Sequence, residues 1–457
     1  MELSRSPAPN VRSLSKRLLG AAAWVVFGAG AAHVLRLGGN LVATRLLVPE
    51  MFGLVAIAGL VPMILSLLSD IGFRENVCRS PNGDDPTFLN TLWSVQLIRG
   101  WSLWGACLLL AASLHVVGAW GWLDPRSTYG DPRLPWVIAV SSMSIAIGSL
   151  HSTKVFSENR HLRMTQLLKI ELLAQLVGVV LMIVLAWATE SIWSILLSGL
   201  ISTGVYVVLS HTWLPGQNNR LVWDRDALQQ VMTFGKWLFW SSAFTVIASN
   251  ADKILLGGFV APEVLGFYSI ASNLVGAVDT LVSQVFSRVA MPGLSEVARN
   301  NPQRLAAAYF KLRKRFDPLL LLLSGALFSA GHLIIDLLYD PRYRSAGPML
   351  EILSLSLLAS RYSLAQTAYL AINRPQYQVV LNVARLVTIY AMAWGAYLLF
   401  GLKGALVAIA LRDIPILPLI FYFNAKHAMN SVKLELGLLL IWPVGYALGQ
   451  GVMLLAR

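Results

Sequence analysis

Several charged residues of this 457-residue chain lie inside, or at the ends of, long apolar stretches. The cations are Arg36, Arg99, Lys253, Arg361, Arg385 and Arg412, and the acids are Asp70, Glu171, Asp252, Asp279, Glu351 and Asp413. A charge at the centre of a membrane costs at least about 2.5–3.5 kcal/mol, so such side chains face the protein interior or water. Arginine binds phosphate oxygens through two parallel hydrogen bonds and does not lose its charge. The cations are therefore candidate ligands for a phosphorylated group within a membrane.

Most of these cations also have a purely structural explanation. Arg36 either lines a cavity or pairs with a carboxylate such as Asp70. Arg99 lies near the end of its apolar segment, where a long side chain can reach the membrane surface. Arg361 and Arg385 lie deeper in their segments, where this is harder. We therefore predict Arg361 and Arg385 as the strongest candidate ligands in the second half of the chain.

The remaining charged candidates occur close together in sequence. Asp252 and Lys253 point about 100° apart on a helix, so at most one is expected to face a cavity while the other pairs locally. Arg412 and Asp413 are more typical of a structural pair than of a gate. Asp279 is a candidate for a cation or proton site, although a lone carboxylate does not establish coupling.

The composition is that of a membrane protein. Charged residues make up 13% of the chain and hydrophobic residues 56%, whereas a soluble domain has about 25% charged residues. The net charge of +13 needs no nucleic-acid partner, because membrane proteins concentrate Lys and Arg in cytoplasmic loops. Cys78 and Cys107 are too few for a disulfide framework or a cysteine metal site. We predict no cofactor, and leave open whether Na⁺ or H⁺ drives the protein.

The apolar residues fall in blocks of roughly 20, the length that crosses a hydrocarbon core. They predict an all-α polytopic membrane protein with about thirteen membrane helices, within a range of 12–14. The predicted segments are 20–47, 53–73, 88–114, 134–157, 164–188, 191–213, 231–260, 264–287, 317–339, 347–371, 376–400, 403–423 and 434–455.

The distribution of basic residues predicts the orientation. With the N-terminus inside, the inside loops hold 23 Lys and Arg residues and the outside loops hold 7. The first apolar run continues to Val48, well beyond the 7–15-residue core of a signal peptide, and is predicted to be an uncleaved helix. The inside stretch 291–316 is basic, and its Lys and Arg residues are better explained as a topology anchor than as a specific lipid site.

An internal repeat relates the two halves of the chain. Residues 49–58 (PEMFGLVAIA) and 262–271 (PEVLGFYSIA) are identical at five of ten positions, at a constant offset of 213. Each copy follows the first helix of a six-helix half, so the halves keep the same orientation and form a parallel repeat. The predicted domains are a bundle over 1–213, a cytoplasmic linker over 214–230, a bundle over 231–423 and an additional helix over 424–457.

These motifs resemble a known family. Asp252 to Gly257, followed by 265–271, resembles the seventh-helix signature of the Wzx-type polysaccharide flippases of the MOP exporter superfamily, which also contains MurJ and the MATE exporters. Supporting matches cover much of the chain, at 44–53, 70–73, 292–295, 304–309 and 338–353. Many members have fourteen helices, so the predicted thirteen is a departure from the pattern.

The resemblance implies two helical bundles that face each other across a central cavity. The implied substrate is an undecaprenyl-diphosphate-linked oligosaccharide, moved between leaflets of the bacterial inner membrane by alternating access for O-antigen, capsule or exopolysaccharide synthesis. A polysaccharide polymerase and chain-length machinery are the implied partners.

Two other classes of protein share parts of this pattern. A MATE-like drug exporter would have the same architecture, but a pump for cationic drugs should favour acids in its cavity. A membrane polymerase or glycosyltransferase would need an acid/base pattern outside, and the acids of the outside loops show none. The sequence has no Walker A motif, so we predict a transporter that is not itself an ATPase.

Overall fold

The computed structural model describes residues 11–69, 73, 76–77, 80, 82–161, 163–229, 250–286, 290–374 and 376–456. Within these ranges every regular element is a helix, which confirms the all-α prediction. The α-helices are α1 (Val11–Leu46), α2 (Pro49–Leu68), α4 (Pro86–Ala119), α5 (Leu134–Ser149), α6 (Lys154–Arg160), α7 (Met164–Thr189), α8 (Trp193–Thr212), α10 (Ala251–Phe259), α11 (Pro262–Val285), α12 (Met291–Asn300), α13 (Leu305–Leu338), α14 (Ala346–Ser354), α15 (Leu357–Ser360), α16 (Ser363–Ala371), α17 (Gln376–Ala410), α18 (Leu417–Ala425), α19 (Val432–Leu439) and α20 (Ile441–Ala456). Asp70 and Cys78 lie outside the described residues.

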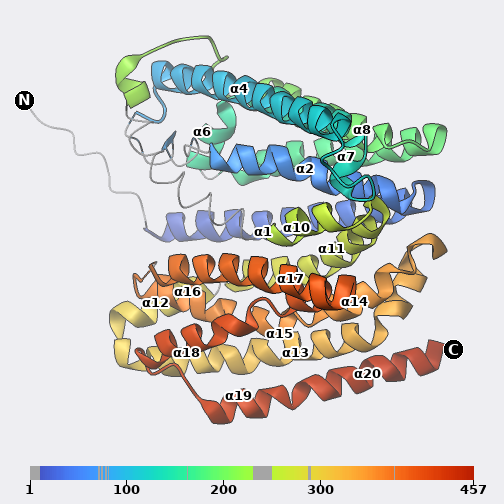
Figure 1. Cartoon of the computed structure of the whole chain (residues 1–457). Helices are drawn as coiled ribbons and strands as arrows, with labels where there is room; N and C mark the ends of the chain where they lie inside the picture. Colours follow the sequence, from blue (N-terminus) through green and yellow to red (C-terminus); the bar gives the residue numbers. More distant parts are fainter. Residues whose placement is uncertain are drawn as a thin grey trace, which may run out of the picture. The chain divides into compact units, whose positions relative to one another are not determined.

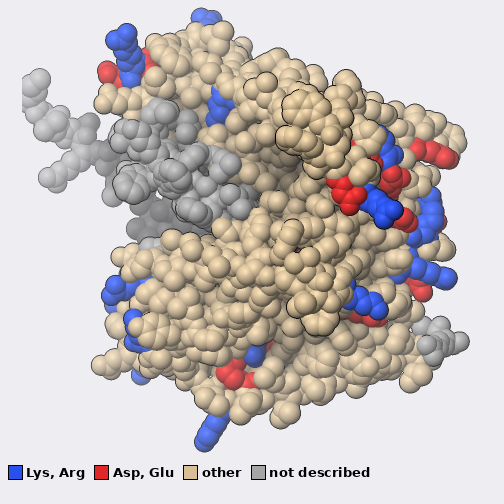
Figure 2. Space-filling model, in the orientation of Figure 1, with Lys and Arg blue, Asp and Glu red and all other residues tan. Residues whose placement is uncertain are grey.

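The helices are those of a multi-pass membrane protein. Among the described residues, eight helical stretches are long and apolar enough to cross a membrane, and nine if α5 and α6, bent by 65°, form one span. Large apolar side chains are exposed, including Leu399 at 77% and Leu455 at 90%, as expected for surfaces that face lipid. On the face shown in Figure 2, charged side chains are sparse and gather in a few clusters.

Each of the thirteen predicted segments overlaps a helix, but several are broken. The segment 347–371 forms three short helices, α14, α15 and α16. Gly401 has a positive φ of 63° and interrupts α17, between two segments that were predicted as separate helices. The predicted count of thirteen spans stays a prediction.

The chain divides into two compact units. Unit 1 comprises residues 1–47, 61–116 and 135–242, and unit 2 comprises 48–60, 117–134 and 243–457. α2 therefore begins in unit 2 and ends in unit 1, and Pro62 lies just past that change. The domain boundaries predicted from the repeat stay a prediction.

In unit 1, α7 packs along both α1 and α8 (Figure 1). Gln175 donates a hydrogen bond to the carbonyl of Ala32, at 2.8 Å, and the Cβ position of Gly178 faces the side chain of Ser202 at 2.8 Å. Small residues and a polar side chain thus bring these helices together, as is typical within membranes.

Residues 214–229 of the predicted linker lie along unit 1 as a strap. Asn219 Oδ1 accepts hydrogen bonds from the hydroxyl of Ser152 at 2.7 Å and the amide of Thr153 at 3.2 Å. Further along, the amide of Arg220 donates to Asn90 Oδ1 at 2.9 Å. Side chains of the α4 and α6 regions therefore satisfy polar groups of this stretch, which has no regular structure before residue 225.

In unit 2, α13 packs along α20 (Figure 1). A Cβ at Gly325 of α13, or at Gly445 of α20, would overlap the backbone of the facing helix. A Cβ at Gly449 would overlap the hydroxyl of Ser329. Gly445 and Gly449 form a Gly-x-x-x-Gly pattern, which lets two helix backbones approach closely. This close approach docks the C-terminal helix onto unit 2.

Candidate functional site

The main polar cavity of unit 2 has a volume of about 800 Å³. α11, the α15–α16 region, α17 and the turn after α17 supply its walls. Its polar and charged lining residues are Asp279, Thr280, Ser283, Ser360, Ser363, Gln366, Arg385, Arg412 and Asp413. Hydroxyls and a carboxamide therefore surround two guanidinium groups and two carboxylates, which suits a ligand carrying both phosphate and hydroxyl groups.

Arg385 is held in this cavity by a carboxylate. Its Nε lies 2.6 Å from Asp413 Oδ1, and its Nη1 donates to Asn382 Oδ1 at 3.0 Å. Arg412 lies 4.0 Å from the other oxygen of Asp413. Asp413 was predicted to pair with its neighbour Arg412, whereas its short contact is with Arg385.

A smaller cavity of about 190 Å³ shares Asp279 and Arg412 with the first. It is also lined by Asp252 and Lys253. Tyr268 donates its hydroxyl proton to Asp252 Oδ2, while Asp252 Oδ1 has no hydrogen-bond partner among the described residues. Asp252 and Lys253 therefore both line this cavity, although at most one of them was expected to face a cavity.

Unit 1 has a separate cavity of about 630 Å³, lined by Arg99, Gln96, His151 and Tyr206 among others. Arg99 donates from Nε to the carbonyl oxygen of Ser69 at 2.8 Å, and from Nη2 to the carbonyl of Ser66. These carbonyls lie at the C-terminal end of α2, where a cation is favourable. The hydrogen bonds hold the guanidinium of Arg99 beside the cavity.

Two of the predicted cations line none of these cavities. Arg36 lies exposed on α1. Arg361 is 4% exposed, and its Nη2 lies 3.1 Å from Glu435 Oε2 and donates to the hydroxyl of Tyr362 at 2.8 Å.

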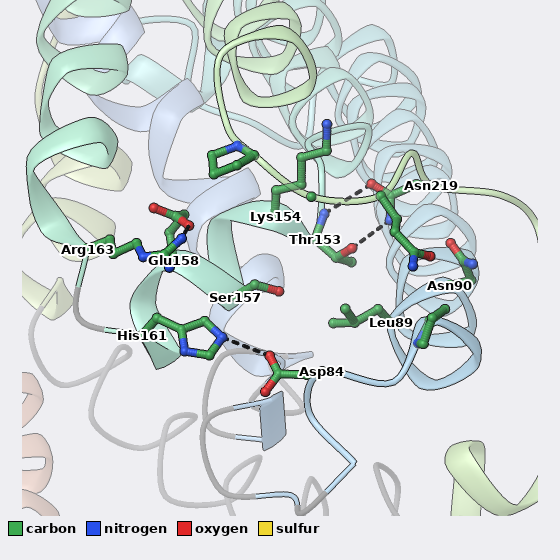
Figure 3. A pocket seen from close by; sticks show the side chains of 14 residues that line it. Asp84, Leu89, Asn90, Thr153, Lys154, Ser157, Glu158, His161, Arg163 and Asn219 are labelled. Carbon is green, nitrogen blue, oxygen red and sulfur yellow. Dashed lines mark hydrogen bonds and ion pairs between the residues drawn. The ribbon is translucent and has the colours of Figure 1, made fainter. Parts of the chain in front are cut away.

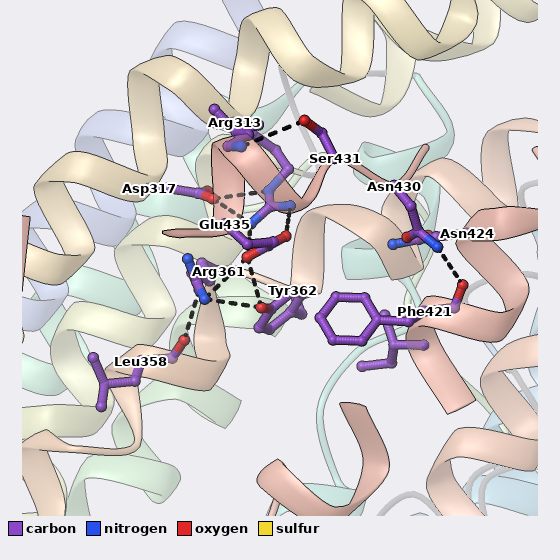
Figure 4. Close-up of polar contacts among 12 residues, drawn as sticks. Arg313, Asp317, Leu358, Arg361, Tyr362, Phe421, Asn424, Asn430, Ser431 and Glu435 are labelled. Atoms are coloured by element: carbon purple, nitrogen blue, oxygen red, sulfur yellow. Dashed lines mark hydrogen bonds and ion pairs between the residues drawn. The ribbon is translucent and has the colours of Figure 1, made fainter. Parts of the chain in front are cut away.

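Arg361 belongs to a buried ion cluster that the sequence did not predict (Figure 4). Its other charged members are Arg313, Asp317 and Glu435. Arg313 Nη2 lies 2.6 Å from Asp317 Oδ2, and Arg313 Nη1 contacts Glu435 Oε1. The cluster joins α13 and α19 to the residue that follows α15.

The sequence analysis counted Arg313 among the basic residues of the inside stretch 291–316, but its side chain is only 1% exposed and pairs inside the protein. Lys311, Lys314 and Arg315 are exposed. The acidic residue four positions later, Asp317, was the available signal, because i and i+4 side chains meet on a helix. The contact with Glu435 could not be seen from sequence, since it joins positions 122 residues apart.

A fourth polar pocket, the second in unit 1, lies at the strap that follows α8 (Figure 3). Its volume is about 270 Å³. Most of its charges are paired: Asp84 lies 3.0 Å from His161, and Glu158 lies 3.3 Å from Arg163. Lys154 donates to the carbonyl of His211, at the end of α8, at 2.8 Å. These contacts fasten loops and helix ends to one another.

Comparison with known proteins decides the family. A family model described as "Polysaccharide biosynthesis protein" matches residues 42–346. The chain belongs to this family. The resemblance found in the sequence is thereby confirmed.

Two curated relatives are similar over part of their length. One is "Amylovoran biosynthesis protein AmsL" of Erwinia amylovora, 24% identical over 255 residues that cover 54% of this chain and 63% of that protein. The other is "Teichuronic acid biosynthesis protein TuaB" of Bacillus subtilis (strain 168), 20% identical over 294 residues that cover 63% and 57%. The chain thus spans about three fifths of the length of these relatives.

Solved structures show the fold. "Lipid II flippase MurJ, inward closed conformation" superposes with a TM-score of 0.64 at 12% identity, over 94% of this chain and 99% of that one. An inward-facing multidrug resistance MATE transporter of the MOP superfamily superposes with a TM-score of 0.60 at 14% identity, over 92% and 93%. This polysaccharide biosynthesis protein therefore has the fold of the MOP superfamily.

Proposed function

We propose that this protein moves a lipid-linked oligosaccharide across the bacterial inner membrane for polysaccharide biosynthesis. The substrate class is an undecaprenyl-diphosphate-linked glycan, carried from the cytoplasmic to the periplasmic leaflet by alternating access, with the N-terminus in the cytoplasm. The observation that supports this most directly is the 800 Å³ cavity, in which Arg385 and Arg412 lie among hydroxyls and a carboxamide. The family and the printed names of the relatives supply the biological context.

The cavity chemistry fits an anionic diphosphate that enters by exchange. The contact with Asp413 already orients the guanidinium of Arg385 in the cavity, so a diphosphate can take the place of Asp413 on Arg385. The hydroxyl and amide side chains then offer donors and acceptors to sugars. The lipid tail stays in the bilayer.

Charge balance bears on the driving force. The two adjoining cavities of unit 2 hold Lys253, Arg385 and Arg412 against three acids, Asp252, Asp279 and Asp413. A bound diphosphate would leave this region strongly negative unless an acid took up a proton or a cation entered with the substrate. We propose Asp279 and Asp413 as the groups that respond, because they line the same cavity as Arg385.

The test is the leaflet distribution of lipid-linked oligosaccharide in cells that lack the protein. We expect accumulation in the cytoplasmic leaflet. It should be rescued by the wild type and by Lys403→Ala, an exposed cation just after the break at Gly401, but not by an equally expressed Arg385→Ala before that break. Normal glycan export in the deletion strain, with no second transporter, would overturn the proposal. Loss of drug export instead would favour the MATE-like alternative, and an intact leaflet distribution with unpolymerised glycan would favour a polymerase.

A further inference from the structure

The two copies of the internal repeat pack against each other inside unit 2. Gly53, the fifth residue of the first copy, faces the carbonyl of Pro262, the first residue of the second. Gly266, the fifth residue of the second copy, faces the carbonyl of Pro49 in the same way. A Cβ at either glycine would overlap the facing carbonyl oxygen. The contact is therefore reciprocal, and equivalent glycines of the repeat make it possible.

The segment 117–134 is fastened beside this crossing. The amide and hydroxyl of Thr128 both donate to the carbonyl of Val260, at 2.9 and 2.8 Å. The hydroxyl of Tyr129 donates to the carbonyl of Ile254 at 2.8 Å. Burial raises the pKa of Tyr129 to about 12, so this hydroxyl keeps its proton at neutral pH. Three hydrogen bonds thus tie a segment of the first half of the chain to α10, in the second half.

An ion pair joins the same segment to the first repeat copy. Arg133 Nη2 contacts Glu50 Oε1 and lies 2.7 Å from Asp131 Oδ2. Burial of the Asp131 carboxyl opposes ionisation, but the hydrogen bonds and charge of Arg133 hold its pKa below the usual range. Because Arg133 and Glu50 are 47% and 40% exposed, their pair is weak and can open at little cost.

Pro62, four residues after the first repeat copy, is a candidate hinge within α2. α2 passes from unit 2 to unit 1 between Leu60 and Val61, and Pro62 follows at once. Proline cannot donate the helical hydrogen bond of its position, and it allows a helix to bend there. The segment 48–60 can therefore change its direction relative to the rest of α2.

We propose that the reciprocal contact of Gly53 and Gly266, fastened by the 117–134 segment, is a gate that closes the periplasmic end of the transport path and opens by separation of the two repeat copies. The substrate that passes this glycine gate, and the side of the membrane on which the gate lies, rest on the proposed function. The contacts of the gate are the crossing of glycines and carbonyls, a few hydrogen bonds, an exposed ion pair, and the packing of Phe52 and Phe267 against the ring of Tyr343.

Alanine substitution tests the closed contact. In a background with Cys78→Ser and Cys107→Ser, Ser283→Cys places a thiol in the main cavity. We expect Gly53→Ala and Gly266→Ala to raise its labelling by a membrane-impermeant maleimide from the periplasmic side several-fold. Gly59→Ala and Gly395→Ala are the controls, because a Cβ at either position meets open space. Unchanged labelling in the gate variants, or an equal rise in the controls, would overturn the proposal.

Reversible cross-linking tests the gate without weakening it. Glu50→Cys with Glu263→Cys joins the two repeat copies, since both residues line one pocket, whereas Asp131→Cys with Arg133→Cys lies within one segment. With a short reducible bifunctional reagent, only the first pair should stop glycan transport and block labelling of Ser283→Cys, and a reductant should restore both. Full transport with the gate cross-linked would refute the gate but leave the proposed function intact. Blocked labelling in a protein that moves no lipid-linked glycan would support the gate and refute the proposed function.

Discussion

At the scale of single residues, the pairing of Arg385 with Asp413 is the contact that the proposed substrate would have to change. Asp413 orients Arg385, but it also competes with any anionic ligand for the same nitrogens. Removing the charge of Asp413 should therefore strengthen the binding of an anionic ligand, whereas removing Arg385 should weaken it.

We therefore expect substitutions of Arg385 and of Asp413 to change the affinity of the purified protein for inorganic diphosphate in opposite directions. Arg385→Ala should weaken binding roughly tenfold or more, since a charge-assisted hydrogen bond is worth about 1.5–3 kcal/mol. Asp413→Asn should strengthen it, because the competing charge is gone. Isothermal titration calorimetry measures both, with Lys403→Ala as the control. Equal affinity of the wild type and Arg385→Ala would show that Arg385 is not a ligand.

The buried cluster around Glu435 gives Arg361 a second explanation, as a structural cation. Removing one partner of a buried ion pair costs about 3–5 kcal/mol, because the other charge is left uncompensated. Glu435→Gln should therefore lower the thermal unfolding temperature of the detergent-solubilised protein. Glu296→Gln, at an exposed position of α12, should leave it unchanged.

A double variant separates the two roles of Arg361. Arg361→Met with Glu435→Leu removes both charges, so much of the stability lost in Glu435→Gln should return. If transport returns with it, Arg361 stabilises the fold and does not bind substrate. If the double variant is stable but inactive, Arg361 binds substrate, as the sequence predicted.

Residue types could be predicted from the sequence, but their partners could not. Charges inside apolar segments stand out in any membrane protein, which is why Arg385, Asp279 and Lys253 were found. Asp413 was assigned to its sequence neighbour, Arg412, and the structure places it closer to Arg385, 28 positions away. Long-range partners depend on how helices pack, which hydropathy does not encode.

At the scale of helices, the docking of α20 onto α13 depends on small residues. Gly445 faces the backbone of Leu322, so any side chain there would push the two helices apart. We expect Gly445→Leu to detach α20, so that its end becomes accessible to protease and a thiol introduced at the contact by Ser329→Cys becomes accessible to a thiol reagent. Gly451→Leu is the matched control in the same helix, because a Cβ there meets open space. Similar protease and reagent sensitivity in both variants would contradict docking through Gly445.

Helix bounds were predicted well where an apolar run has clear polar ends, and poorly where tertiary packing determines where a helix begins or breaks. α7 spans Met164–Thr189 against a predicted 164–188, because its apolar run has clear polar ends. By contrast, 347–371 reads as one apolar block but forms three short helices. α13 begins twelve residues before its predicted start, because its first turns are amphipathic and basic, and their buried face is formed by Tyr309 and Arg313.

At the scale of the whole molecule, the sequence predicted the internal repeat but not its contact. Five identities in ten residues showed that 49–58 and 262–271 are related. That the two copies cross at their glycines is a property of the fold, since sequence similarity does not specify that related segments touch. Gly53 and Gly266 are among the identical positions that indicate the duplication, and they are also the residues that permit the two copies to pack closely.

The distribution of basic residues predicts the orientation of the whole chain, and this can be tested directly. The arrangement with the N-terminus inside places the 117–134 segment in the periplasm and the 214–229 strap in the cytoplasm. In the cysteine-free background, Trp122→Cys and Gln217→Cys both introduce a thiol at an exposed position. An impermeant maleimide added to intact spheroplasts should label only Trp122→Cys, and Gln217→Cys should react only after lysis. The reverse result would mean that the N-terminus lies outside. The glycine gate would then lie at the cytoplasmic end, and the proposed direction of transport would be reversed.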